Sequence, residues 1–184
     1  MCTLYIDLIL IDMIPVYYVN NAFIDCISLV DQPAIESDFI LFNKQIRFQS
    51  DNKQRSITGP ILIPDMKIYR RDESGEYYLV FSKESIKQFA SDLITSGNTK
   101  NVSAMHNGQL LTGIKPIEVY IKDSTRNILN GFEDLPDGTL FITYLIEDAD
   151  LYNRIINENY SGFSIEAEIK IKKEDLFNKI KTTR

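Results

Sequence analysis

One histidine limits the chemistry that this sequence can perform. His106 is the only histidine of the 184-residue chain, and Ser164 lies in the sequence GFSIE that begins at Gly162. A serine becomes a nucleophile at neutral pH when a neighbouring base takes its proton, and imidazole is the usual base. Any serine–histidine chemistry in this chain must therefore use His106. By its residue type alone, Ser164 could equally be an ordinary serine of a strand.

A third catalytic residue is less well defined by the sequence. Glu166 shares a strand face with Ser164, and residues two apart on a strand lie roughly 6–7 Å from each other. From that position its carboxylate could orient His106. The other candidates for this role are the carboxylates Asp31, Asp25 and Glu118. The alternative interpretation of each is a solvated strand residue, and a serine–histidine dyad with a weak third partner also remains open.

Length and composition are those of one globular domain. With 184 residues, 44% hydrophobic and 25% charged, the chain can bury a sizeable core. The net charge of −6 argues against general nucleic-acid binding, which requires a basic face, although a local basic segment lies at residues 170–173. We expect a single domain over residues 1–184, with a polar loop or linker around residues 43–55.

The two cysteines, Cys2 and Cys26, are too few for a disulfide framework and lack the spacing of metal ligands. We interpret them as reduced thiols of a cytosolic protein. With a single histidine a structural zinc site is not expected, and we predict no cofactor. A carboxylate-only magnesium or calcium site is left open, although the sequence contains no EF-hand loop.

The apolar N-terminal run from Leu4 to Val19 is predicted to form buried strands. Asp7, Asp12 and Pro15 interrupt this run, and it is shorter than the roughly 20 residues that a membrane-spanning helix needs. No basic residue precedes it, so a secretory signal is not expected. We therefore expect no membrane partner.

β-Branched and aromatic residues occupy most apolar positions, which favours an α+β, mainly β fold. Strands are predicted over residues 4–11, 16–19, 24–30, 38–42, 56–63, 77–82, 115–122, 139–146 and 162–171. Turn residues at 72–75 predict a hairpin between residues 68–70 and 77–81. Helices are predicted over residues 83–95, between the end signals Ser82 and Gly97, over 149–158 after Asp148, and over 173–181.

Several segments, taken in order, resemble the prohead maturation proteases of tailed bacteriophages. They are ISLVDQPAIE at residues 27–36, GP at 59–60, IPD at 63–65, IYRR at 68–71, EYY at 76–78 and FSKE at 81–84. The segments around His106 and Ser164 complete the match. The resemblance covers residues 24–170, which is most of the chain.

This resemblance implies a fold similar to that of the herpesvirus capsid-assembly proteases, a small β-barrel with peripheral helices. It implies a serine endopeptidase that acts in the host cytoplasm, inside the immature capsid. Its substrates would be the scaffold protein and the N-terminal segment of the major capsid protein. By motif position, His106 would be the general base and Ser164 the nucleophile. A homodimer is implied by analogy with the herpesvirus relatives in fold.

The order of one motif suggests a rearranged chain. In other branches of this protease class, a Glu-Val-Ser-Leu-Val motif followed by Pro-Ala lies after the serine strand. Here the similar sequence CISLV at residues 26–30 and its Pro33-Ala34 stand before His106. We hypothesise a circular permutation that leaves Cys26 at the acidic position. The hypothesis requires strand 26–30 to lie close to strand 162–169.

Two further functional classes remain as alternatives. The chain could be a non-catalytic structural or scaffold-associated virion protein on the same fold, because a fold does not determine an activity. The presence of both His106 and Ser164 favours the enzyme, whereas the lack of a clear third residue favours the structural protein. A generic β-rich binding domain would explain the strands but not the order of the motifs.

Overall fold

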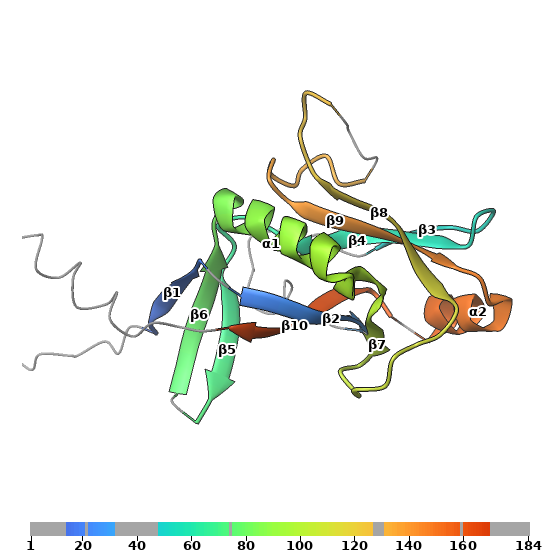
Figure 1. Cartoon of the computed structure of the whole chain (residues 1–184), viewed down its shortest axis with the longest axis horizontal. Coiled ribbons are helices and arrows are strands. Elements are labelled where there is room, and N and C mark those ends of the chain that lie inside the picture. The colour runs from blue at the N-terminus through green and yellow to red at the C-terminus, as the bar shows by residue number, and fades with distance from the viewer. Residues whose placement is uncertain are drawn as a thin grey trace, which may run out of the picture.

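The computed structural model describes residues 14–20, 22–31, 48–73, 75–126, 131–158 and 160–169. It shows a mainly β protein with two α-helices (Figure 1). The strands are β1 (Val16–Val19), β2 (Ala22–Val30), β3 (Gln49–Asp51), β4 (Ser56–Leu62), β5 (Ile68–Asp72), β6 (Gly75–Phe81), β7 (Val102–Ala104), β8 (Ile114–Ile121), β9 (Leu140–Ile146) and β10 (Gly162–Ile169). The helices are α1 (Lys83–Ser96) and α2 (Ala149–Asn157), and a short 3-10 turn covers Asn98–Lys100.

The strands form three sheets. Their orders are β1-β6-β5, β10-β2-β7 and β3-β4-β9-β8. Figure 1 shows β1, β5 and β6 at one end of the molecule and α2 at the other. In the central sheet, β2 pairs antiparallel with β10 and parallel with β7. This sheet therefore joins three segments that are far apart in the sequence.

The expected small β-barrel is not confirmed, because the strands of the described residues form three separate sheets and no closed barrel. β10 and β4 belong to different sheets. The ring of Phe163 on β10 lies so close to Gly59 on β4 that a Cβ at this glycine would be 3.1 Å from it. One backbone hydrogen bond, from Phe48 N to Ser161 O (2.7 Å), connects the two sheets at this corner. The buried Phe163 side chain thus packs at the corner where these two sheets meet.

The two described helices begin where the sequence predicts and end within one residue of the predicted positions. Ser82 caps α1 through a hydrogen bond from Ser85 N, and Gly97 ends it in the left-handed region, with φ 74°. The Asp148 side chain caps α2 by accepting hydrogen bonds from two backbone amides. The buried face of α1, made of Ser85, Ile86, Phe89, Ala90 and Leu93, anchors this helix in the hydrophobic core.

Most predicted strands are confirmed within one or two residues, and the departures have physical causes. The polar stretch expected as a loop or linker contains β3, whose residues are all exposed. It forms through backbone pairing with β4, which needs no apolar side chains. β7 was not predicted, because three residues are too few to show an alternating pattern. The predicted elements 4–11, 38–42 and 173–181 lie outside the described residues.

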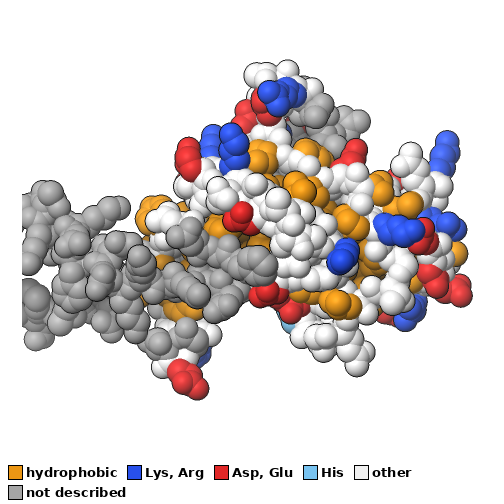
Figure 2. All heavy atoms as spheres, in the orientation of Figure 1, with side chains coloured by type: hydrophobic (Ala, Val, Ile, Leu, Met, Phe, Trp, Pro, Cys, Tyr) orange, Lys and Arg blue, Asp and Glu red, His pale blue; other side chains and the backbone are white. Residues whose placement is uncertain are grey.

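Two features of the described residues concern membrane and nucleic-acid partners: the length of the helices and the distribution of surface charge. Neither described helix is long and apolar enough to cross a membrane. On the face shown in Figure 2, Lys and Arg side chains lie among Asp and Glu side chains and do not gather into one basic patch. The basic segment 170–173 lies outside the described residues.

A buried lysine organises the connection between β8 and β9. Lys122 is 6% exposed. Its Nζ donates hydrogen bonds to the backbone carbonyls of Phe132 (3.0 Å), Glu133 (2.7 Å) and Leu135. All three ammonium protons therefore have acceptors, which is the condition under which a lysine can be buried.

Replacement of this ammonium should destabilise the fold. We expect Lys122→Met to lower the free energy of unfolding by at least about 2 kcal/mol, because it removes three charge-assisted hydrogen bonds and leaves carbonyls unsatisfied. Urea denaturation measures the change. The control is Lys115→Met, which removes an exposed ion pair with Glu147 (2.6 Å) and should cost at most about 1 kcal/mol. Equal effects of the two substitutions would contradict this assignment.

Candidate functional site

Three serines form a row across the central sheet. In the strand register Ser164 of β10 lies opposite Ser28 of β2, and Ser28 lies beside Ser103 of β7. Residues directly opposite each other in a sheet present their side chains on the same face. Ser28 and Ser103 are fully buried, and Ser164 is 6% exposed. One face of this sheet therefore carries three buried hydroxyl groups next to one another.

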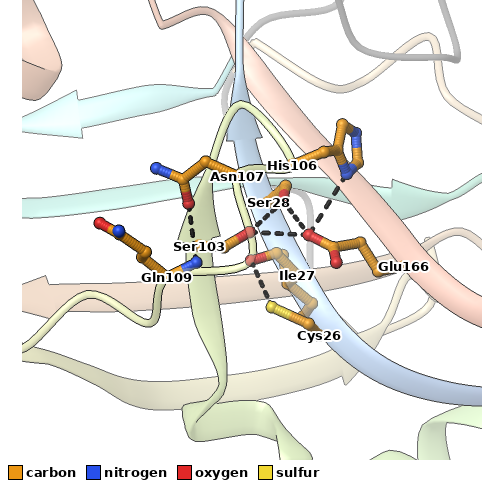
Figure 3. Close-up of polar contacts among 8 residues, drawn as sticks. All are labelled: Cys26, Ile27, Ser28, Ser103, His106, Asn107, Gln109 and Glu166. Carbon is orange, nitrogen blue, oxygen red and sulfur yellow. Dashed lines mark hydrogen bonds and ion pairs between the residues drawn. The ribbon is translucent and has the colours of Figure 1, made fainter.

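Glu166 places a carboxylate over this row. It follows Ser164 by two residues on β10 and therefore shares its face. Its Oε1 accepts hydrogen bonds from Ser28 Oγ (2.5 Å) and Ser103 Oγ (2.7 Å). The two serine hydroxyls also contact each other. Figure 3 shows both serines pointing toward the carboxylate.

A tight turn after β7 presents the histidine. The amide of Asn107 donates to the carbonyl of Ala104 (3.1 Å), and the two residues between them, Met105 and His106, have φ of 51° and 53°. Two successive positive φ angles are what a type I′ turn requires, and each costs about 1–3 kcal/mol in a residue other than glycine. Such strained positions cluster at functional sites.

This turn brings the histidine to the carboxylate. His106 Nδ1 lies 3.3 Å from Glu166 Oε1, and the two side chains are 45% and 32% exposed. In Figure 3 a dashed line joins this ring nitrogen to the Glu166 carboxylate oxygen that both serines contact. A carboxylate at Nδ1 favours the tautomer with its proton on that nitrogen, which leaves Nε2 as a proton acceptor. A general base needs this orientation.

The same hydrogen bonds keep Glu166 ionised. Donation from Ser28 is the largest cause that lowers the pKa of this carboxyl below its ordinary value of 4.5, with further contributions from Ser103 and His106. Desolvation acts in the opposite direction but does not outweigh these contacts. The site therefore holds a carboxylate anion against the imidazole at neutral pH.

Cys26 borders the cluster. It lies opposite Glu166 in the register of β2 and β10 and is 8% exposed. Burial raises the pKa of its thiol, and the neighbouring Glu166 charge adds to the increase. A thiol in this state is a poor nucleophile, so Cys26 is not a candidate for covalent catalysis.

The structure places the predicted site residues unequally. It brings His106 and Glu166 into contact, and it puts Ser164 on the same face as Glu166. Among the described residues, no hydrogen bond joins Ser164 to His106. Ser28 and Ser103, which contact the carboxylate, were not predicted as site residues. The only signal for Ser28 was its place in the CISLV motif.

The other candidate carboxylates lie elsewhere. Glu118 of β8 accepts a hydrogen bond from Thr143 (2.9 Å) in a different sheet. Asp25 is exposed and lies at the register shift of the β2–β10 pair, between the residues opposite Glu166 and Ala167. Asp31 is exposed beyond the end of β2. Glu166 is thus the one carboxylate of the described residues within ion-pair distance of His106.

The described residues contain no group of three or more His, Cys, Asp or Glu side chains arranged to hold a metal ion.

No protein-family model, no curated protein and no solved structure matches the chain. The geometry of the site and the sequence motifs therefore carry the functional argument.

The loss of stability caused by removal of the Glu166 carboxylate should depend on pH. Because the folded-state pKa of Glu166 is lowered from 4.5, its ionised form stabilises the fold above that pH, and this stabilisation disappears as the pH falls through the folded-state value. We expect Glu166→Gln to be less stable than the wild type by about 1–2 kcal/mol at neutral pH. The difference should shrink below pH 4.5.

Urea denaturation in a pH series measures this difference. Glu118→Gln is the matched control, since it removes a carboxylate from another sheet. A stability difference for Glu166→Gln that stays constant from neutral pH into strong acid would contradict the assigned ionisation of Glu166.

Proposed function

We propose that this protein is a serine endopeptidase with Ser164 as nucleophile, His106 as general base and Glu166 as the residue that orients the imidazole. The contact between His106 Nδ1 and Glu166 carries the proposal. The tautomer that this contact favours leaves Nε2 as a proton acceptor, and Ser164 shares its face of β10 with Glu166. Residues two apart on a strand are separated by roughly 6–7 Å. An imidazole with a hydrogen bond at each nitrogen spans about this distance.

In the proposed reaction His106 Nε2 takes the proton of Ser164 while Oγ attacks the peptide carbonyl. The imidazolium then gives that proton to the leaving amine as the C–N bond breaks. In the second half-reaction His106 takes a proton from water, which attacks the acyl-enzyme, and returns it to Ser164 Oγ as the ester bond breaks. The Glu166 anion stabilises the imidazolium through Nδ1. Proton transfer of this kind accelerates a reaction by about 10²- to 10⁴-fold. The half-exposed imidazole can be reached from solvent, as a base that acts on a substrate must be.

The biological role that we propose is capsid maturation in a tailed bacteriophage. It rests on the resemblance of the motifs in residues 24–170 to those of prohead proteases. The substrates would be the scaffold and major capsid proteins, and cleavage would take place inside the immature capsid in the host cytoplasm. A homodimer belongs to the same proposal by analogy.

The circular permutation is part of this proposal, and strand pairing supports it. A permuted chain requires the CISLV strand to lie beside the serine strand although it precedes the histidine. β2 and β10 pair along their length, from Gly162 opposite Val30 to Ile169 opposite Ala22. At the position of the acidic residue of other branches, Cys26 faces Glu166. The carboxylate would then have been transferred to the neighbouring strand.

A structural virion protein without activity is the second candidate. Two observations favour it: Ser164 is 6% exposed, and the carboxylate of Glu166 is occupied by Ser28 and Ser103. A buried serine must be exposed by a local movement before it can attack a substrate. In this alternative the polar cluster would only stabilise the central sheet.

Labelling with an activated phosphonate distinguishes the two candidates. A fluorophosphonate reacts with a serine only when a base activates it. We expect one adduct per chain, located on Ser164 by peptide mass spectrometry. The adduct should be absent from Ser164→Ala and His106→Ala, because the first variant lacks the nucleophile and the second the base. Co-expression with the scaffold protein should show cleavage by the wild type and none by either variant.

Ser56→Ala is the control, because Ser56 is a buried strand serine of another sheet. It should label and cleave like the wild type. A folded wild-type protein that neither labels nor cleaves would support the structural alternative. An adduct on Ser103 or Ser28 would instead show that the nucleophile is a different member of the row.

A further inference from the structure

We propose that Ser28 and Ser103 are positioning residues, which hold Glu166 against His106 Nδ1 and thereby set the tautomer of the imidazole. The inference rests on the proposed function only for its effect on cleavage. The arrangement itself is a property of the folded chain. It assigns a role to two hydroxyl groups that lie 75 residues apart in the sequence and come from different strands.

The two hydroxyls contact the carboxylate from fixed positions. Ser28 is on the central strand of its sheet and Ser103 is on the adjacent edge strand, β7. Both are fully buried, so water does not compete for the carboxylate at these two points. A serine side chain has one rotatable bond to its oxygen, whereas a glutamate side chain has three torsions and loses more rotamer freedom when it is ordered. The strands therefore restrain the carboxylate through the serines.

The restraint acts on the same oxygen that faces the histidine. Glu166 Oε1 accepts from Ser28 (2.5 Å) and Ser103 (2.7 Å), and it lies 3.3 Å from His106 Nδ1. Hydroxyl groups that donate to a carboxylate stabilise its anionic form. An anion at a fixed position next to Nδ1 selects the proton on that nitrogen. Without the hydroxyls, the partly exposed carboxylate is free to turn toward water.

The number of hydroxyl protons predicts different effects for the substitution of one serine and of both serines. The two hydroxyls and Oε1 make three mutual contacts, but with Glu166 ionised only two hydroxyl protons are present. Either both hydroxyls donate to the carboxylate, or one donates to the other, which then donates to the carboxylate. At least one donor reaches Oε1 in each arrangement. Removal of one serine leaves one donor, and removal of both leaves none.

The single histidine of the chain makes this inference directly measurable. In the full-length ¹⁵N-labelled protein, the two imidazole nitrogen signals belong to His106 alone. At a pH where the ring is neutral, their chemical shifts give the fraction of each tautomer. We expect the Nδ1–H tautomer to predominate in the wild type, to decline in Ser28→Ala and in Ser103→Ala, and to become the minor species in the double variant.

The same variants should lose activity in parallel. We expect kcat/KM for peptide cleavage to fall about 10- to 100-fold in the double variant, by analogy with the loss of hydrogen-bond partners that orient metal-binding histidines. Ser56→Ala, which removes a buried hydroxyl from another sheet, should leave both the tautomer and the cleavage rate unchanged. Glu166→Gln should shift the tautomer at least as far as the double variant, because it removes the anion itself.

The outcomes separate this inference from the proposed function. A tautomer shift in the variants of a protein that cleaves nothing would uphold the positioning role and reject the peptidase. A predominant Nε2–H tautomer in the wild type would overturn the positioning role, even if no variant folds. An unchanged tautomer in a folded double variant would overturn it as well, whatever the cleavage rate.

Discussion

The pairing of β2 with both β10 and β7 is the constraint on which the site depends. β2 lies between β10 and β7, and these two strands do not pair with each other. The pairing of each with β2 therefore sets their relative positions in the sheet. Ser164, Ser28 and Ser103 form a row because these two registers coincide at Ser28. A shift of either register by one residue would turn the side chains to the other face. The hydrophobic side of the same strands resists such a shift, since Ile27 and Leu29 are fully buried.

The electrostatics of the site depend on buried serine hydroxyls that lie next to the partly exposed pair of Glu166 and His106. The serine hydroxyls are buried, the carboxylate and the imidazole are half-buried, and one carboxylate oxygen joins both halves. The hydrogen bonds from Ser28 and Ser103 stabilise the carboxylate anion, and its contact with His106 Nδ1 places the negative charge next to the imidazole. Solvent access at His106 is compatible with proton exchange with a substrate. The strained turn at Met105 and His106 keeps the imidazole in this position at a cost in conformational energy.

Local patterns explain how much of the fold could be predicted. The alternation in residues 140–146 and the cap signals at Ser82, Gly97 and Asp148 depend on neighbours in the sequence, and they correspond to β9, α1 and α2. β7 has three residues and β3 has only exposed ones, so both depend on a partner strand for their conformation. The closed barrel was expected from a resemblance. The described strands form three separate sheets instead, and no local pattern encodes how strands far apart in the sequence are divided among sheets.

The sequence by itself determined which groups are available for chemistry: one imidazole, a serine in a strand, and a carboxylate two residues later on the same face. These follow from composition and from the period of two along a strand. Tertiary structure decided which carboxylate meets the imidazole, and it added the hydroxyls of Ser28 and Ser103. The physical reason is that contacts between strands depend on register and strand order. Segments separated by 63 and 138 residues must meet for Glu166 to acquire its partners.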